Sequence, residues 1–120
     1  MDQLVDLDAA ALVLRSYAEV WRDLGYSVGP ITWADGQTTV NVVTTDRSAV
    51  RGDYSCAIEL RHGQQEGHLV LDAGGWCDRT YWSGEGDSFI DDSPGWQEWL
   101  DLTRFESVVA EFGNLFGRRA

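Results

Sequence analysis

The feature that most constrains the fold is the stretch from Gly67 to Trp82, which reads GHLVLDAGGWCDRTYW. Two apolar runs of period two, at 68–73 and 76–82, flank the pair Gly74-Gly75. A Gly-Gly pair between alternating runs predicts a tight β-hairpin. We therefore expect this hairpin to form the middle of an antiparallel sheet.

Alternation along the hairpin separates two faces, because successive side chains of a strand point to opposite sides. We expect one face to lie in the core, formed by Leu69, Leu71, Ala73, Cys77, Arg79 and Tyr81. The other face then carries Asp72, Trp76, Asp78 and Trp82 and is partly exposed to solvent. A register shift of one residue would exchange the two faces.

Helical patterns lie at both ends of the chain. Apolar residues recur at spacings of three and four over 6–24, with Asp6 or Asp8 as the N-cap and Gly25 as the left-handed end. The sequence Thr103-Arg104-Phe105-Glu106 reads as a capping box, and an apolar series follows it to the C-terminal end. Gly113 is expected to weaken that second helix by about 1 kcal/mol relative to alanine.

Strand patterns fill the space between the helices. We expect a hairpin of strands 27–34 and 38–45 around Asp35-Gly36, a strand from Tyr54 to Arg61, and a short strand at 96–102. With 120 residues the chain is long enough for one core, so 1–120 is interpreted as a single domain. The prediction is an α+β fold: an antiparallel meander of about five or six strands, with both helices packed on one face.

Charge narrows the choice of partner. The net charge is -11 and the pI is near 4.3, which argues against binding to nucleic acid and favours a cationic partner, or solubility alone. No apolar run approaches the roughly 20 residues of a membrane span, and the N-terminus lacks a basic leader. We therefore expect a cytoplasmic protein. The expected oligomeric state is a monomer or a homodimer.

An acidic segment follows the hairpin at 83–95, and Trp76, Trp82, Trp96 and Trp99 lie beside it in the sequence. Its carboxylates do not have the spacing of an EF-hand loop, so it is interpreted as a loop on a protein-binding edge or as a solvated loop. Together with the exposed hairpin face it defines the predicted contact surface: Asp72, Trp76, Asp78, Trp82, Glu85, Asp87, Asp91 and Asp92.

The sequence contains no catalytic motif, so neither catalysis nor a cofactor is expected. His62 and His68 bracket a loop, and together with Glu59 or Glu66 they offer metal-ligating side chains, but the spacing fixes no third ligand and argues against a metal site. Cys56 and Cys77 lack CxxC spacing and are interpreted as small buried hydrophobic residues.

The segments 54–82 and 99–112 resemble the immunity proteins of bacterial polymorphic toxin systems, specifically the small TriTu family. The hairpin of that family is matched by Gly67, Gly75, Cys77 and Asp78, and its C-terminal helix cap by Thr103 and Glu106. The resemblance implies an acidic protein that binds a cognate toxin and blocks its basic active cleft. It implies no particular contact residue, because immunity proteins bind through variable surfaces.

Two alternatives stay open. The first is a small-ligand binder or lyase-like enzyme with an apolar pocket lined by tryptophans, for which His68, Asp78 and Arg79 are the polar candidates. The second is a structural dimer in which exposed tryptophans of two copies meet.

Overall fold

The computed structural model describes residues 5–35, 43–46, 54–86 and 89–117. These residues form an N-terminal helix, an antiparallel sheet and a C-terminal helix, which confirms the expected α+β class. The elements follow the chain in this order: α1 (Leu7–Asp23), β1 (Ser27–Val28), β2 (Thr32–Asp35), β3 (Val43–Thr44), β4 (Tyr54–His62), β5 (Gln65–Asp72), β6 (Trp76–Trp82), β7 (Phe89–Asp92) and α2 (Leu102–Gly117).

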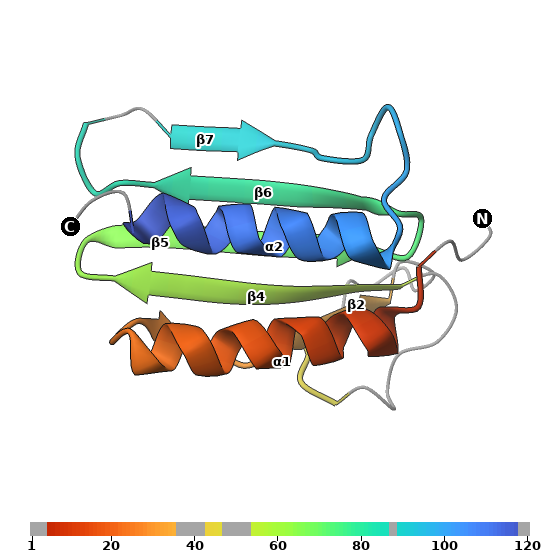
Figure 1. Ribbon diagram of the computed structural model, residues 1–120, viewed down its shortest axis with the longest axis horizontal. Helices are drawn as coiled ribbons and strands as arrows, with labels where there is room; N and C mark the ends of the chain where they lie inside the picture. Colours follow the sequence, from red (N-terminus) through yellow and green to blue (C-terminus); the bar gives the residue numbers. More distant parts are fainter. Residues whose placement is uncertain (1–4, 36–42, 47–53, 87–88, 118–120) are drawn as a thin grey trace.

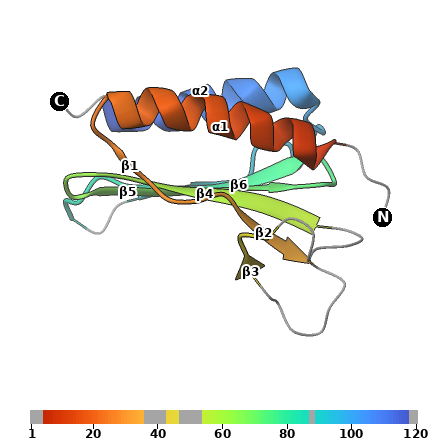
Figure 2. The same ribbon diagram turned by 90° about the horizontal axis from the view of Figure 1, so that it is seen from below.

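The sheet forms one layer and the two helices form a second layer on one of its faces (Figure 1, Figure 2). The strand order is β3-β2-β4-β5-β6-β7, and β1 also pairs with β4. From β4 to β7 each strand lies beside the next one, as in the expected meander, whereas β3 lies on the side of β2 away from β4. The face of β5, β6 and β7 opposite the helices is covered by neither helix (Figure 2).

Helix α1 forms where predicted because both of its ends are capped. The Asp6 side chain accepts hydrogen bonds from the backbone N–H groups of Asp8 (3.0 Å) and Ala9 (3.3 Å). At the other end Gly25 has a φ of 90°, and its N–H donates to the carbonyl of Arg22. The N–H of Tyr26 donates to the carbonyl of Trp21, which completes a Schellman motif.

The β5–β6 hairpin has a three-residue loop, not the two-residue turn that the sequence predicts. Asp72 pairs with Trp76, so residues 73–75 form the loop. Gly75 has a φ of 91° and its N–H donates to the carbonyl of Asp72, the geometry typical of a three-residue loop. Because Asp72 and Trp76 are cross-strand partners, they share the face away from the helices, while Leu71 and Cys77 are buried beneath them. The predicted assignment of faces is therefore confirmed.

The strand predicted at 27–34 is divided in two. Both β1 and β2 pair with β4, and residues 29–31 separate them. Pro30 lies in this interruption because it has no backbone N–H to donate to the ladder.

The hairpin predicted around Asp35-Gly36 has a different register. Ala34 pairs with Val43, whereas a two-residue turn would bring the strands together directly after Ala34. The predicted tight turn is therefore wrong. Of the strand predicted at 38–45, residues 43–45 are described, and Val43 and Thr44 form β3; 36–42 lie outside the described residues.

The short strand predicted at 96–102 is also wrong, because this part of the chain folds over the end of the hairpin. The Cys77 N–H donates to the carbonyl of Pro94 (2.8 Å), and the Leu100 N–H donates to that of Gly75 (2.7 Å). A Cβ added at Gly95, where φ is 91°, would lie 2.5 Å from the Gly75 carbonyl oxygen. The close crossing therefore requires glycine at that position.

The predicted capping box at the start of α2 does not form. The N-cap is Asp101, whose side chain accepts a 2.8 Å hydrogen bond from the Arg104 N–H, and the Asp101 carbonyl accepts from Phe105. Thr103 therefore lies inside the first turn, and Glu106 has no N-cap N–H to reach back to.

Helix α2 approaches the sheet and α1 closely, and glycines make this approach possible. A Cβ at Gly67 of β5 would lie 2.7 Å from the Phe116 ring, and one at Gly113 of α2 would lie 2.4 Å from the Trp21 indole nitrogen. Gly113, which the sequence analysis treats as a weak point of the helix, is thus a contact point between the helices. The buried side chains form one core cluster between the two layers.

Candidate functional site

The open face of the sheet carries most of the residues predicted for the contact surface. Alternation places Asp72 of β5, and Trp76, Asp78 and Trp82 of β6, on this face, and Asp91 joins them from β7. Asp78, Trp82 and Asp91 are exposed, while Asp72 and Trp76 are half-buried. Side chains up to 19 positions apart in the chain, from Asp72 to Asp91, thus lie on one surface.

The remaining predicted residues do not belong to this face. Glu85 is exposed in the connection between β6 and β7. Asp92 pairs with Arg79 across the strands and points toward the helices. Asp87 lies outside the described residues.

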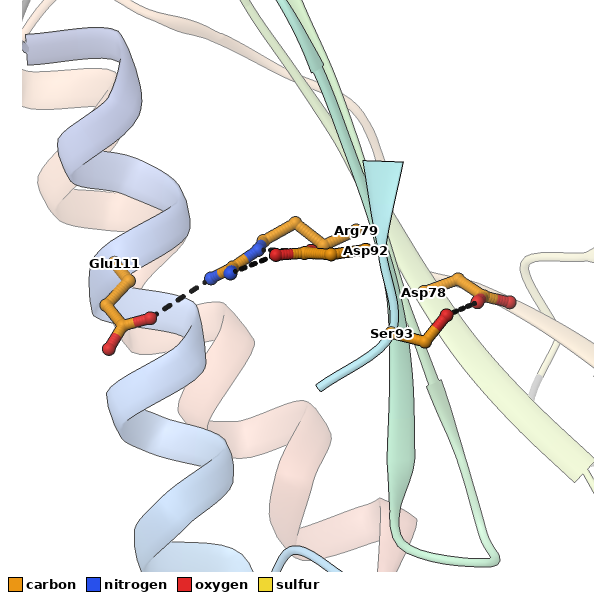
Figure 3. A network of polar contacts seen from close by, with 5 residues as sticks. All are labelled: Asp78, Arg79, Asp92, Ser93 and Glu111. Carbon is orange, nitrogen blue, oxygen red and sulfur yellow. Dashed lines mark hydrogen bonds and ion pairs between the residues drawn. The ribbon is translucent and has the colours of Figure 1, made fainter. Parts of the chain in front are cut away.

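Asp92 belongs to a polar network on the helix side of the sheet (Figure 3). The Arg79 guanidinium donates to both Asp92 carboxylate oxygens, at 2.9 and 2.7 Å, and to Glu111 of α2 at 3.1 Å. The hydrogen bond to Asp92, reinforced by the one to Glu111, holds the pKa of Arg79 above its usual value in spite of burial. Arg79 therefore connects β7 and α2 to β6, and this network stabilises the fold.

The small-ligand alternative requires Asp78, Arg79 and His68 to converge. Figure 3 shows Asp78 on the side of the sheet opposite Arg79, where it accepts a 3.0 Å hydrogen bond from Ser93. His68 is an outward-facing residue of β5. The three side chains are therefore divided between two faces and line no common pocket.

Strand β7 is the element of this surface that the sequence analysis missed. Its sequence, Phe-Ile-Asp-Asp, does not alternate, and the acidic composition around it is typical of a loop. The sequence feature that indicates β7 is the glycine-containing turn at 83–86, because it separates β6 from the apolar residues Phe89 and Ile90. The register pairs Trp82 with Phe89 and so adds a third aromatic side chain to the open face, beside Trp76 and Trp82.

We use the name β6–β7 strip for six outward-facing side chains of the open face: Trp76, Asp78, Thr80, Trp82, Phe89 and Asp91. At the hairpin end of the strip, the Trp76 ring meets the Trp96 ring edge-on at a centroid distance of 5.6 Å. Trp96 is 69% exposed. The strip thus combines carboxylates with large aromatic surfaces that are accessible to a partner.

The other end of the strip contains a shallow depression of about 220 Å³, here named the Trp82–Phe89 depression. Its wall includes two aromatic rings, two carboxylates, one arginine and one histidine, contributed by Glu59, Arg61, Glu66, His68, Trp82 and Phe89. Arg61 and Glu66 form an exposed ion pair with an N–O distance of 3.0 Å. No local sequence pattern predicts this depression, because β4, β5, β6 and β7 all contribute to it.

The histidines do not form a metal site. His62 is on the helix side of β4, where its ring lies 4.6 Å from that of Tyr26, whereas His68 is on the open face. Within the described residues, no group of three or more His, Cys, Asp and Glu side chains is arranged to hold a metal ion.

Neither cysteine belongs to a disulfide, and both are buried, as the sequence predicts. Burial, together with the neighbouring Cys56 thiol, raises the pKa of Cys77 from 9.0 to about 12. The Cys77 thiol therefore stays protonated near neutral pH and is a poor nucleophile.

Fold and surface define a class: an α+β protein with a two-helix layer on one side of an antiparallel sheet and an acidic, aromatic face on the other. Comparison with protein-family models, with curated proteins and with solved structures gave no match. In the described part of the chain, neither helix has the length and apolar character needed to cross a membrane.

Proposed function

We propose that this chain is a non-catalytic immunity protein, which binds a cognate bacterial toxin domain and blocks its active site. The observation that supports this most directly is the β6–β7 strip, where Asp78 and Asp91 lie among Trp76, Trp82 and Phe89 on a face that neither helix covers. The resemblance of the hairpin and its flanks to TriTu immunity proteins points the same way.

The chemistry of the strip favours a cationic partner. Toxins that cleave nucleic acid or act on nucleotides need basic clefts to hold phosphates, and a carboxylate surface is complementary to such a cleft. The net charge of -11 speeds the approach of a positively charged protein, and the aromatic rings provide contact area that excludes water. The partner is therefore a basic toxin domain, and the chain acts in the cytoplasm of the cell that it protects.

The first test is capture of the partner from the native host with a tagged chain at low salt. The proposal expects a stoichiometric basic protein that arrests growth when produced alone and is harmless when this chain is produced with it. A captured protein without toxicity, or the absence of any stoichiometric partner, would contradict the proposal.

The second test compares two double variants with equal changes in charge. Asp78→Arg with Asp91→Arg alters the strip, while Asp23→Arg with Glu106→Arg alters exposed positions of the helix layer. Association measured by stopped flow at low salt should slow by about tenfold or more for the strip variant. Equal slowing by both variants would show that the net charge matters and the strip does not.

A further inference from the structure

The Trp82–Phe89 depression brings together the groups that recognise a guanidinium ion. Trp82 and Phe89 are cross-strand partners, 37% and 63% exposed, so both rings are available to an incoming side chain. The Trp82 indole N–H donates to the Gly86 carbonyl at 3.0 Å, which fixes the orientation of that ring. A cation over an exposed aromatic face is attracted by the ring quadrupole.

Carboxylates complete the wall of the depression. Glu66 is the cross-strand partner of both Arg61 and Trp82, and Glu59 is the partner of the outward-facing His68. All these residues line the same concave surface. Two carboxylates and one arginine leave an excess of negative charge beside the two rings.

The ion pair between Arg61 and Glu66 shows that the Glu66 carboxylate can bind a guanidinium ion. The Arg61 guanidinium lies 3.0 Å from the Glu66 carboxylate, but both side chains are well exposed, at 61% and 48%. Exposed ion pairs of this kind contribute little stability, so a second guanidinium can replace Arg61 at low cost.

We propose that the Trp82–Phe89 depression is a subsite for one arginine side chain of the protein that this chain binds. Arginine fits better than lysine because its planar, weakly hydrated guanidinium stacks on aromatic rings and forms paired hydrogen bonds with carboxylates. This inference rests on the proposed function only for the source of the arginine. The recognition chemistry belongs to the chain itself.

The subsite is tested without the partner, using N-acetyl-arginine methylamide as the probe and its neutral citrulline analogue as the control. The Trp82 indole N–H signal is followed by NMR during the titration, with that of Trp99 as an internal reference. Saturable shifts of Trp82 with the arginine probe, absent with citrulline, are expected. Equal responses to both probes, or equal shifts of Trp82 and Trp99, would overturn the proposal.

Two arginine variants separate local from general electrostatics. Arg61→Gln frees Glu66 and should tighten binding of the arginine probe by about twofold to fivefold. Arg104→Gln is the matched control, because Arg104 also pairs with an exposed glutamate, Glu98. This pair lies near the segment that crosses the β5–β6 hairpin loop, at the end of β6 opposite Trp82. The same tightening in both variants would show that only the overall charge attracts the probe.

The aromatic part of the subsite is tested by Trp82→Leu and Phe89→Leu, each followed through the remaining shifted signals. Either change should weaken binding of the probe by about twofold to fivefold. Amide spectra confirm that both variants are folded. Unchanged affinity in both would overturn the role of the rings.

The outcomes distinguish this inference from the proposed function. If the captured toxin depends on Asp78 and Asp91 but the arginine probe does not bind, the subsite is wrong and the immunity function stands. If the probe binds in the expected pattern but no toxic partner exists, the subsite stands and the immunity function is wrong.

Discussion

Cys77 lies in the core with a completely buried side chain. Because burial changes the pKa of its thiol, the free energy of unfolding depends on pH through this residue. Its pKa is about 12 in the folded protein, compared with 9.0 as the ordinary value. Well below pH 9 the thiol is protonated in both the folded and the unfolded state. Between pH 9 and 12 the unfolded chain releases the proton first, so the free energy of unfolding falls as pH rises, by about 1.4 kcal/mol per pH unit for this group.

Urea unfolding between pH 8 and 10.5 measures this effect. The Cys77→Ala variant should lose this part of the pH dependence, whatever its stability at pH 8. Alkylation supplies an independent check in a Cys56→Ala background: native protein should resist iodoacetamide at pH 9, and urea-unfolded protein should react. Rapid labelling of the native protein would show that the thiol is accessible.

Asp91 and Asp92 are adjacent and chemically identical, but they lie on opposite faces of β7. Asp92 holds Arg79, whose side chain is only 13% exposed, whereas Asp91 faces solvent. Asp92→Asn should therefore lower the free energy of unfolding by about 1–3 kcal/mol, since it weakens two hydrogen bonds to a mostly buried cation. Asp91→Asn should change it by less than about 0.5 kcal/mol. Equal losses in urea titrations would contradict this division.

At the scale of elements, the sequence predicts best where local signals agree. Helix α1 has an apolar stripe, an N-cap aspartate and a terminal glycine, and all three function as expected. The start of α2 offers two capping residues, Asp101 and Thr103, and the hydrogen bonds favour Asp101. Local pattern cannot decide between them, because the crossing of 93–101 over the hairpin determines where the helix begins.

At Gly113 we expect helix propensity alone to predict the wrong sign for the stability change caused by alanine. Alanine would favour an isolated helix by about 1 kcal/mol, but its Cβ would meet the Trp21 indole nitrogen at 2.4 Å. Overpacking of this kind costs about 1–3 kcal/mol, so Gly113→Ala should be destabilising overall by up to about 2 kcal/mol. Asn114→Ala, at the exposed next position, is the control and should stabilise slightly. A higher thermal midpoint for Gly113→Ala would show that the helices separate easily.

At the scale of the molecule, alternation in one hairpin is enough to predict which side chains lie on the open face. It is not enough to predict the Trp82–Phe89 depression. That depression depends on the register between β4, β5, β6 and β7, and therefore on pairs such as Glu66 with Trp82 and Trp82 with Phe89. The non-alternating sequence of β7 hides the last of these pairings, so the acidic segment reads as a loop.

The excess of negative charge gives salt two opposite effects. With 20 acidic and nine basic residues, folding brings like charges together, and their repulsion lowers stability. Raising NaCl from 10 to 150 mM shortens the screening length from about 30 to about 8 Å, so the urea midpoint should rise. The same salt should slow association with a cationic toxin. A lower urea midpoint in salt would mean that ion pairs such as Arg79 with Asp92 outweigh the repulsion, and the acidic surface would then contribute to the fold as well as to binding.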